Sequence, residues 1–397
     1  MLDFNKEELC VGCTNCYSVC PTGAVEMSES ERGFYIPRIF QDKCISCGHC
    51  DRTCPVLIQK QECNTKDMKC SYVYAQDLDS RLESTSGGLF YELARYTVSH
   101  NGTVCGCVWD DDFTAKHICT QNLDDVKRMR GSKYVQSDLG SCFKEIKQAL
   151  KTGRVLFTGT PCQTTALSHY VGDHTNLITC ALICGGVPSP RVWKLYKESL
   201  EESAGSKIAR LHMRSKETNW LVPEVSVEFE NGRRIREILL TRNLYGTNFG
   251  AGLTISNACM DCSYKLDQVS ADILIGDHWG INSRMLRSSG NKGASCVIML
   301  TGKGKALFRS IEDTLIQEDG DLQGIIDSHR VLMKSHVPNR NRDEFFHRLN
   351  HENITDLFQE YAPKDSGPRA KVKEAIYKSN LYIPLFTARW LLKNRKK

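Results

Sequence analysis

The pattern of apolar and polar positions changes along the chain and predicts different elements in successive parts. "SYVYAQ", "GTVCGCVWD" and "AKHICTQ" are typical of strands, the last two forming a hairpin, while "SCFKEIKQALKTG" is typical of a helix. "GRVLFTGTPCQTTALSHYV" predicts a strand, a turn and a helix, and "NLITCALICGGVPSP" a strand that leads into the helix "PRVWKLYKESLEES". This alternation of strands and helices predicts an α/β core.

The pattern becomes strand-rich after Lys207. "KIARLHMRSK", "VPEVSVEFENG" and "RRIREILLT" predict strands, with Asn231 and Gly232 as a hairpin turn. "GASCVIMLT" predicts a further strand, and the residues from about Gly302 onward are typical of helices. The end, "NLYIPLFTARWLLKNRKK", combines aromatic residues, leucines and five basic residues. It predicts either a docked terminal helix or a peripheral contact with an anionic membrane surface.

Composition narrows the class of protein. The 397 residues are enough for two or three domains, and 41% of them are apolar, which argues against wholesale disorder. A net charge of +5 is too mild for a nucleic-acid partner. Met1 is followed by "LDFNKEELC", which has neither a basic start nor an apolar run, so we expect a cytoplasmic protein. In that compartment, 20 cysteines indicate metal or redox chemistry rather than disulfides.

Two cysteine runs near the N-terminus are the most specific feature. "CVGCTNCYSVCP" begins at Cys10 and "CISCGHCDRTCP" at Cys44, and "GAVEMSESERGFYIPRIF" between them predicts a short hairpin. Three closely spaced cysteines suit a 4Fe–4S cube, whereas the alternative, a pair of zinc knuckles, usually uses separated pairs. In two-cluster ferredoxins the fourth cysteine of each run binds the other cluster. The predicted ligand groups are therefore Cys10, Cys13, Cys16 and Cys54, and Cys44, Cys47, Cys50 and Cys20.

Two segments could bind phosphate. In "STSGGLFYELARYTVSHNG", Ser84, Thr85 or Ser86 can cap a helix, and Gly87 and Gly88 would offer backbone N–H groups at its start. An ordinary cap packed with small residues is the alternative. In "RMRGSKYVQSD" a pyrophosphate could contact the side chains of Arg128, Arg130, Ser132 and Lys133. The alternative there is a solvated basic loop.

Four cysteines beyond the two runs could form a third thiolate site. Cys162 lies in the turn "GTPC" beside a predicted helix N-terminus, a position that stabilises a thiolate. It could be a metal ligand, a redox thiol or a packing residue. Cys259 and Cys262 form a C-x-x-C pair, and together with Cys162 and Cys184 they could complete a four-thiolate site.

Several segments in order, "STSGG", "RGSKYVQSD", "LFTGTPCQ", "ICGGVPSP", "SKETNW", "CMDCSYK" and "ADILIGDHWG", resemble the family of coenzyme F-420 hydrogenase/dehydrogenase β subunits in its ferredoxin-fused form. The resemblance covers roughly residues 1 to 300. It implies FAD beside an iron–sulfur cluster and hydride exchange with a partner such as a deazaflavin. The implied flavin contacts are Ser86, Gly87, Gly88, Arg130, Gly131, Ser132, Lys133 and Tyr134. Cys162, Cys259 and Cys262 are implied ligands of a third cluster, with Cys184 placed fourth by position.

The sequence departs from the family pattern at two positions. Gly185 stands where many relatives have histidine, and His278 where an aromatic residue is usual. If either contacts substrate, the substrate need not be the deazaflavin. No catalytic side chain is assigned, and His117, His212 and His278 are candidates that would equally serve structural roles.

The predicted fold class is mixed α+β and α/β: a two-cluster ferredoxin domain fused to a flavin-binding α/β domain with a helical C-terminal tail. The predicted boundaries are 1–62 for the ferredoxin domain, 70–205 and 206–301 for the two parts of the flavin domain, and 302–397 for the tail.

The predicted function is an FAD-dependent iron–sulfur oxidoreductase, with a protein such as ferredoxin as one partner and a small hydride carrier as the other. Electrons could flow in either direction between these two partners. The alternative is a non-catalytic electron-transfer subunit, tied through association alone to polysaccharide biosynthesis.

Overall fold

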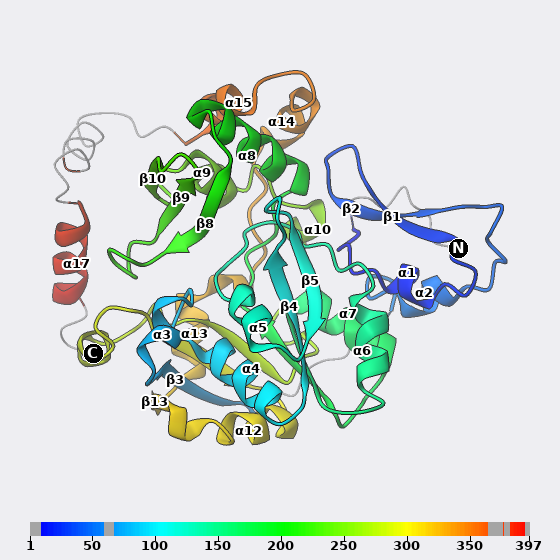
Figure 1. The fold of residues 1–397 in the computed structure, drawn as a ribbon, viewed down its shortest axis with the longest axis horizontal. Coiled ribbons are helices and arrows are strands. Elements are labelled where there is room, and N and C mark those ends of the chain that lie inside the picture. Colours follow the sequence, from blue (N-terminus) through cyan, green and yellow to red (C-terminus); the bar gives the residue numbers. More distant parts are fainter. Residues whose placement is uncertain (1–8, 59–66, 364–375, 377–381, 394–397) are drawn as a thin grey trace.

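The N-terminal unit carries the two cysteine runs on two short helices flanking a hairpin. In this computed structural model the described residues are 9–58, 67–363, 376 and 382–393. Helices α1 (Asn15–Val19) and α2 (His49–Thr53) each follow a residue in the left-handed conformation, Thr14 and Gly48. Between them, β1 (Val25–Glu29) and β2 (Tyr35–Ile39) pair in antiparallel register, as the alternating pattern predicted. The unit lies beside α6 (Cys142–Ala149) and α7 (Pro161–Val171) (Figure 1).

An eight-stranded sheet forms the centre of the molecule. Its order is β13 (Leu315–Asp319), β3 (Lys69–Ala75), β12 (Ser295–Met299), β11 (Ile273–Asp277), β7 (Leu177–Leu182), β6 (Val155–Gly159), β4 (Thr103–Trp109) and β5 (Ala115–Thr120). The four strands β11, β7, β6 and β4 run parallel, and the flanking pairs are antiparallel. All five residues of β6 are buried, as expected for a parallel strand covered on both faces. The predicted α/β core is therefore present.

This sheet draws strands from all three predicted regions after the ferredoxin domain. Strands β11 and β12 come from 206–301, and β13 comes from the tail that was expected to be helical throughout. The expectation for the tail was wrong at Leu315–Asp319, because this short, largely polar edge strand lacks an apolar face that would mark it in the sequence. The domain boundaries themselves stay a prediction.

Helices cover the sheet and connect its strands. They include α3 (Leu78–Leu82), α4 (Leu89–Ser99), α5 (Leu123–Met129) and α12 (Gly302–Arg309), together with α6 and α7. Helix α4 begins after Gly88, which has a φ of 90°, and no side chain caps it. The predicted cap by Ser84, Thr85 or Ser86 is therefore not formed. Leu89, Leu93 and Ala94 of α4 pack into the core against the sheet.

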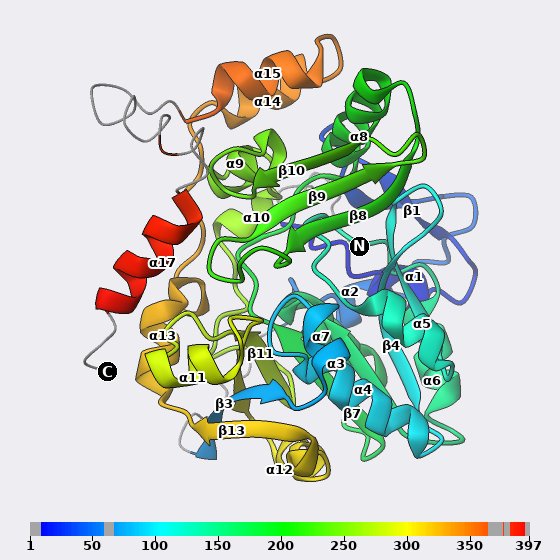
Figure 2. The same ribbon diagram turned by 60° about the vertical axis from the view of Figure 1, so that its left-hand side comes forward.

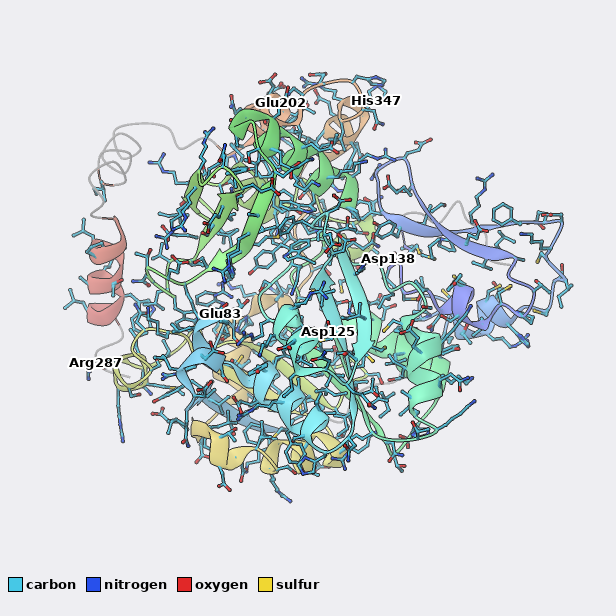
Figure 3. All side chains as sticks on the ribbon, in the orientation of Figure 1. Glu83, Asp125, Asp138, Glu202, Arg287 and His347 are labelled. Carbon is cyan, nitrogen blue, oxygen red and sulfur yellow. The ribbon has the colours of Figure 1, made fainter. Side chains whose placement is uncertain are left out.

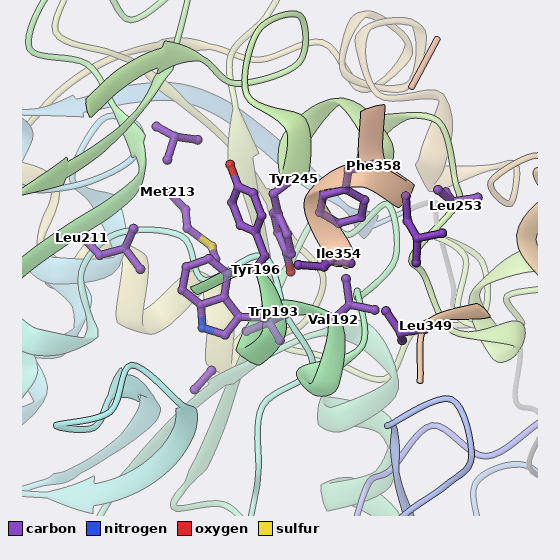
Figure 4. Close-up of a cluster of buried hydrophobic side chains, with 14 of the residues drawn as sticks. Val192, Trp193, Tyr196, Leu211, Met213, Tyr245, Leu253, Leu349, Ile354 and Phe358 are labelled. Carbon is purple, nitrogen blue, oxygen red and sulfur yellow. The ribbon is translucent and has the colours of Figure 1, made fainter. Parts of the chain in front are cut away.

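A second layer stands over one end of the large sheet. Strands β8 (Ile208–Ser215), β9 (Glu224–Phe229) and β10 (Arg234–Ile238) form the predicted antiparallel meander. It packs with α8 (Pro190–Ala204), α9 (Leu244–Gly250), α14 (Arg342–Arg348) and α15 (Ile354–Tyr361). Figure 4 shows the aromatic centre of this layer, where Tyr196 and Tyr245 stack at 5.6 Å and Trp193 and Phe358 flank them. Charged side chains such as Glu202, His347 and Arg287 lie on the outside (Figure 3).

The remaining elements are short helices and a terminal helix. They are α10 (Asn257–Met260), α11 (Ser283–Ser288), α13 (Leu322–Ser328), the 3-10 turns Glu312–Thr314 and Arg330–Leu332, and α17 (Tyr382–Lys393). Helix α17 lies along the edge of the molecule (Figure 2), where Asn219 donates a hydrogen bond to Thr387 and Trp390 packs on an apolar cluster. These are the contacts of a docked helix. Among the described residues, no helix has the length and apolar character needed to cross a bilayer.

Candidate cofactor cavity and cluster sites

The first cysteine run is completed by a cysteine of the second. Cys13 and Cys16 are buried, with 8% of each residue exposed. Burial raises the pKa of Cys13, and the thiols of Cys16, Cys10 and Cys54 raise it further because they lie close by. The structure therefore gathers the predicted inner group of Cys10, Cys13, Cys16 and Cys54.

The second predicted group lies nearer the surface. Cys44, Cys47, Cys50 and Cys20 are each partly exposed. Burial and the neighbouring Asp51 raise the pKa of Cys50, with a smaller effect from Cys47. Hydrogen bonds involving Thr22 outweigh slight burial and lower the pKa of Cys20. We refer to this set as the outer group, and its membership stays a prediction.

The ferredoxin unit is held against α7 by a buried amide. The Asn15 side chain donates to the carbonyl oxygens of Thr53, at 2.9 Å, and of Ala166, at 2.7 Å. Tyr264 lies where the inner group approaches the later cysteines. Burial raises the pKa of Tyr264, and thiols from both sides raise it further. The contributing thiols are Cys162, Cys13, Cys54 and Cys262.

Four cysteines gather beyond Tyr264. Cys162 begins α7 after strand β6, Cys184 follows β7, and Cys259 and Cys262 lie in and just after α10. The carboxyl ends of parallel strands meet at one edge of a sheet, which places Cys162 and Cys184 together. Burial and the neighbouring thiols raise the pKa of Cys184 to about 11 and that of Cys259 to about 12. We call these four residues the cavity cysteines.

The expected stabilisation of a Cys162 thiolate is not observed for the free thiol. Burial raises the pKa of Cys162 well above its ordinary value, and a hydrogen bond with Thr160 opposes this only in part. The loss of hydration in the buried site is therefore the largest influence on the pKa of this free thiol.

The spacing of these cysteines differs from that of a zinc site. A tetrahedral zinc ion with Zn–S bonds of about 2.3 Å holds its sulfur atoms about 3.8 Å apart. Within the described residues, the only group of at least three Cys, His, Asp or Glu ligand atoms within 4.8 Å of one another is Cys105, Cys119 and Cys142. Neither the ferredoxin cysteines nor the cavity cysteines gather that tightly.

A cavity of about 330 Å³ adjoins the cavity cysteines. Its wall includes Gly159, Leu182 and Asp277, at or next to the carboxyl ends of β6, β7 and β11, where ligands bind in open α/β sheets. The predicted flavin contacts on its wall are Ser86, Gly88, Arg130, Gly131, Ser132, Lys133 and Tyr134, and all four cavity cysteines line it too. The structure thus brings the predicted flavin contacts and the predicted third-cluster ligands to one cavity.

Gly87 is the one predicted flavin contact that does not line the cavity. A Cβ atom at Gly87 would lie 2.6 Å from the carbonyl oxygen of Val73 and 2.8 Å from the amide nitrogen of Ser295. Its amide N–H donates to the Ser295 hydroxyl at 3.0 Å. Gly87 therefore allows the turn to pack closely against β3 and β12.

The basic loop uses its charged side chains within the protein. The Lys133 ammonium donates to the carbonyl oxygens of residues 128 to 131, at 3.0 to 3.2 Å, and burial lowers its pKa to about 8. Arg130 forms an ion pair with Asp79 at 3.0 Å and lies over the Tyr91 ring. Arg128 pairs with Asp125 and is not part of the cavity wall. These cations shape the wall, so the groups left to face a phosphate are mainly backbone N–H groups and hydroxyls.

Sequence reasoning missed a buried lysine that links Ser86, on the cavity wall, to Lys292, which does not line the cavity. Lys216 is 4% exposed. Its ammonium donates to the carbonyl oxygens of Ser86 and Lys292, and burial lowers its pKa to about 7. The segment "SKETNW" contributed to the family resemblance, but a lysine in a polar segment carries no local signal of burial.

A buried ion pair on the cavity wall was also missed. Arg214 donates to one carboxylate oxygen of Asp277, and the two side chains are only 5% and 15% exposed. The second nitrogen of Arg214 (Nη2) and the second oxygen of Asp277 (Oδ1) have no hydrogen-bond partner among the described residues. Both residues line the cavity, and the two unpartnered atoms are themselves buried.

One of the three candidate histidines reaches the cavity. His117 lies on its wall, with Nε2 3.2 Å from the Thr158 carbonyl oxygen, and burial lowers its pKa to about 4. His278 instead stacks on Tyr72 at 3.7 Å, and neither it nor His212 lines the cavity. His278 and His212 are thus not placed for chemistry there.

Comparison with known families finds one match for the N-terminal cysteine runs and another for a later part of the chain. Residues 9–58 match the 4Fe-4S dicluster domain, and residues 152–321 match the family described as the C terminus of the beta subunit of coenzyme F420 hydrogenase/dehydrogenase. Over residues 152–321 the chain is similar to the F420 hydrogenase/dehydrogenase beta subunits, and a 4Fe-4S dicluster domain precedes this region. The resemblance predicted from the ordered motifs is thereby confirmed.

Individual relatives are distant. The chain is 24% identical over 194 residues to a subunit of the F(420)H(2) dehydrogenase of Methanosarcina mazei, covering 45% of this chain and 54% of that protein. It is 28% identical over 165 residues to the coenzyme F420-dependent sulfite reductase of Methanocaldococcus jannaschii, covering 40% of this chain and 24% of that protein. It therefore spans about half of the first relative and a quarter of the second.

A solved structure of the F420-reducing [NiFe] hydrogenase complex from Methanosarcina barkeri aligns with 76% of this chain and 94% of its own at 17% identity, with a TM-score of 0.46. Together, the family matches establish an iron–sulfur protein related to F420 hydrogenase and dehydrogenase subunits.

Proposed function

We propose that this protein is an iron–sulfur flavoprotein oxidoreductase that couples one-electron transfer through 4Fe–4S clusters to two-electron chemistry at FAD. The observation that supports this best is the single cavity lined by the glycine turn, the loop 130–134 and all four cavity cysteines. FAD can exchange either one or two electrons, so when bound it would join cluster chemistry to hydride chemistry.

The residues present fit such a cofactor. The volume of about 330 Å³ lies within the range of roughly 300–1,000 Å³ typical of cofactor and ligand sites. Arg214 and Asp277 add a buried cation and a carboxylate to the wall, each with one atom that has no hydrogen-bond partner among the described residues. Ser86, Gly88, Gly131, Ser132 and Tyr134 are the residues that would hold FAD, while Lys133 and Lys216 keep the surrounding turns in place.

The order of the three thiol groups supports an electron relay between the protein surface and the cavity. The four outer cysteines are all partly exposed, whereas Cys13 and Cys16 of the inner group are buried, and Tyr264 lies close to thiols of both the inner group and the cavity cysteines. We propose that an electron-carrying protein such as ferredoxin docks at the outer group. A small hydride donor or acceptor would enter the cavity, where Gly185 lies on the wall without a side chain of its own.

The deazaflavin named in the relatives is one candidate for that small molecule. Either direction of electron flow is compatible with the arrangement, because the order of the thiol groups is the same in both. A non-catalytic electron-transfer subunit is the second candidate function, since the Methanosarcina mazei relative is named as one subunit of a dehydrogenase.

Anaerobic purification with iron, sulfide and released flavin measured per chain tests the proposal. Three 4Fe–4S clusters correspond to about twelve irons, and we expect these with one FAD. Cys259→Ser should reduce the iron content to about eight while the ferredoxin clusters remain. Cys180→Ala is the matched control, because Cys180 is a fully buried cysteine that does not line the cavity.

The outcomes separate the candidate functions. Wild-type protein with about eight irons and no flavin would refute the third cluster and the flavoprotein. Flavin that is present, yet not reduced or oxidised by the deazaflavin or by nicotinamide carriers, would favour the electron-transfer subunit.

A further inference from the structure

Three cysteines meet at a position separate from the cavity. Cys105 lies in β4, Cys119 lies directly opposite it in β5, and Cys142 begins α6. The Sγ atom of Cys119 is 2.6 Å from that of Cys105 and 3.4 Å from that of Cys142. All three Sγ atoms lie within 4.8 Å of one another, and none of the three residues lines the cavity.

These thiols are enclosed by apolar side chains. Cys105 and Cys142 are 0% and 2% exposed, and Cys119 is partly exposed. Leu139, Phe143 and Ile146 belong to the same apolar cluster. The Cys105 sulfur contacts the Cys119 sulfur, and the Cys119 sulfur additionally lies 3.8 Å from the Cys142 carbonyl oxygen. Such a compact set of sulfur atoms is a ready set of soft metal ligands.

A carboxylate lies beside the three thiols, although its oxygens are not within 4.8 Å of all three sulfur atoms. Glu145 lies one helical turn after Cys142 on α6. The Glu145 carboxylate interacts with the Cys119 sulfur, which also contacts the sulfur atoms of Cys105 and Cys142. The Ser141 hydroxyl donates to Glu145 Oε1 at 2.5 Å, which orients the carboxylate as outer-shell partners orient metal ligands.

We propose that Cys105, Cys119, Cys142 and Glu145 bind one zinc ion. Zn–S bonds of about 2.3 Å require sulfur atoms about 3.8 Å apart, so the Cys105 and Cys119 sulfurs need to separate by only about 1 Å. The spacing is too close for a multi-iron cube and leaves three sulfurs where a disulfide would use two. On binding, Zn²⁺ displaces the protons of the three thiols, which pass to solvent, and no electrons are transferred.

The zinc would join the edge hairpin β4–β5 to α6. Helix α6 also packs against α1 of the ferredoxin unit, so the site would brace the surface on which that unit rests. This role is independent of the proposed oxidoreductase function, because the site shares no residue with the cavity wall.

The test uses the full-length protein with its iron clusters reconstituted. Protein is incubated with Zn²⁺ and desalted, zinc and iron are measured per chain, and the zinc environment is read by X-ray absorption at the zinc edge, to which iron does not contribute. We expect one zinc per chain with three sulfur neighbours at about 2.3 Å and one oxygen neighbour at about 2.0–2.2 Å. Cys119→Ser should lose the bound zinc, and Glu145→Gln should weaken zinc affinity by about 10- to 100-fold.

Cys180→Ala serves as the matched control and should retain zinc. Iron content equal to wild type in every variant shows that the fold and clusters are intact, and Cys119 is the least buried of the three thiols, so its replacement disturbs packing least. Zinc retained equally by Cys119→Ser and wild type would overturn the proposal. So would zinc-free wild-type protein, or a Cys105–Cys119 disulfide found by alkylation and mass spectrometry after anaerobic purification.

Discussion

The buried ion pair on the cavity wall provides a quantitative test of the site. We consider Asp277→Asn, which preserves the size of the side chain and removes its charge. Burial alone would lower the pKa of Arg214, but the Asp277 charge reverses this and raises it. In the variant, Arg214 therefore remains a buried cation without its counter-charge, held over the Trp279 ring at 4.8 Å.

The expected magnitude follows from the burial of the pair. Removing one partner of a buried pair costs about 3–5 kcal/mol. Because the asparagine side chain retains an acceptor oxygen, we expect a loss near the lower end, about 3 kcal/mol. The exposed pair of Arg236 and Glu217 is the control, with side chains 40% and 67% exposed. Glu217→Gln should cost no more than about 1 kcal/mol.

Urea unfolding followed by tryptophan fluorescence measures both losses. Trp279 stacks on the buried Trp220 at 5.4 Å, so the signal reports on this region. With a slope of about 3 kcal/mol/M, the Asp277→Asn midpoint should fall by about 1 M, and that of Glu217→Gln by about a third of this or less. Equal shifts for the two variants would refute the reasoning, because they would show that Arg214 does not depend on Asp277.

Three further predictions concern other parts of the fold. Burial lowers the pKa of His117 from 6.5 to about 4, so the neutral residue contributes roughly 3 kcal/mol of stability that is present above pH 6.5 and is lost as the pH falls through 4. In His117→Gln the urea midpoint should therefore depend less on pH between 6.5 and 4. An unchanged pH dependence of the midpoint would contradict this prediction. Gly87→Ala forces a Cβ into backbone atoms and should lower stability by about 1–3 kcal/mol in thermal unfolding, whereas Gly302→Ala, with no atom within 4 Å, should not. Asn15→Ala removes a buried hydrogen bond to Ala166 of α7 and a second one to Thr53 within the ferredoxin unit. It should speed hydrogen exchange at residues 161–171, with no change there showing that the amide does not hold the ferredoxin unit.

Local patterns in the sequence predicted most of the elements because the consecutive residues that carry each pattern are the same residues that form the strand, turn or helix. The apolar strand β6, the turn after it and helix α7 follow one another without interruption, and the cysteine spacing defines the ferredoxin unit in the same way. The strand β13 was missed because an edge strand of polar residues buries little apolar surface.

The parts of the site that sequence reasoning missed depend on long-range contacts. Lys216 meets the carbonyl of Ser86, 130 positions earlier, and Arg214 meets Asp277, 63 positions later. Lys133 illustrates a different limit, since its charge suggested a phosphate contact, yet its ammonium turns back onto its own loop. A sequence pattern identifies which residues could bind a ligand but not which of them the protein uses for itself.

The ferredoxin unit also contributes to the architecture of the other half. Val11 lines the cavity, the Tyr35 amide donates to the Gln136 side-chain oxygen at 2.7 Å, and Arg191 donates to Glu29 on the hairpin. The ferredoxin unit therefore contributes to the cavity wall through Val11, in addition to supplying thiols. A truncated protein that begins after it would have an opened chamber and a bared α7 surface, so separating the two halves by gene truncation would not yield two working modules.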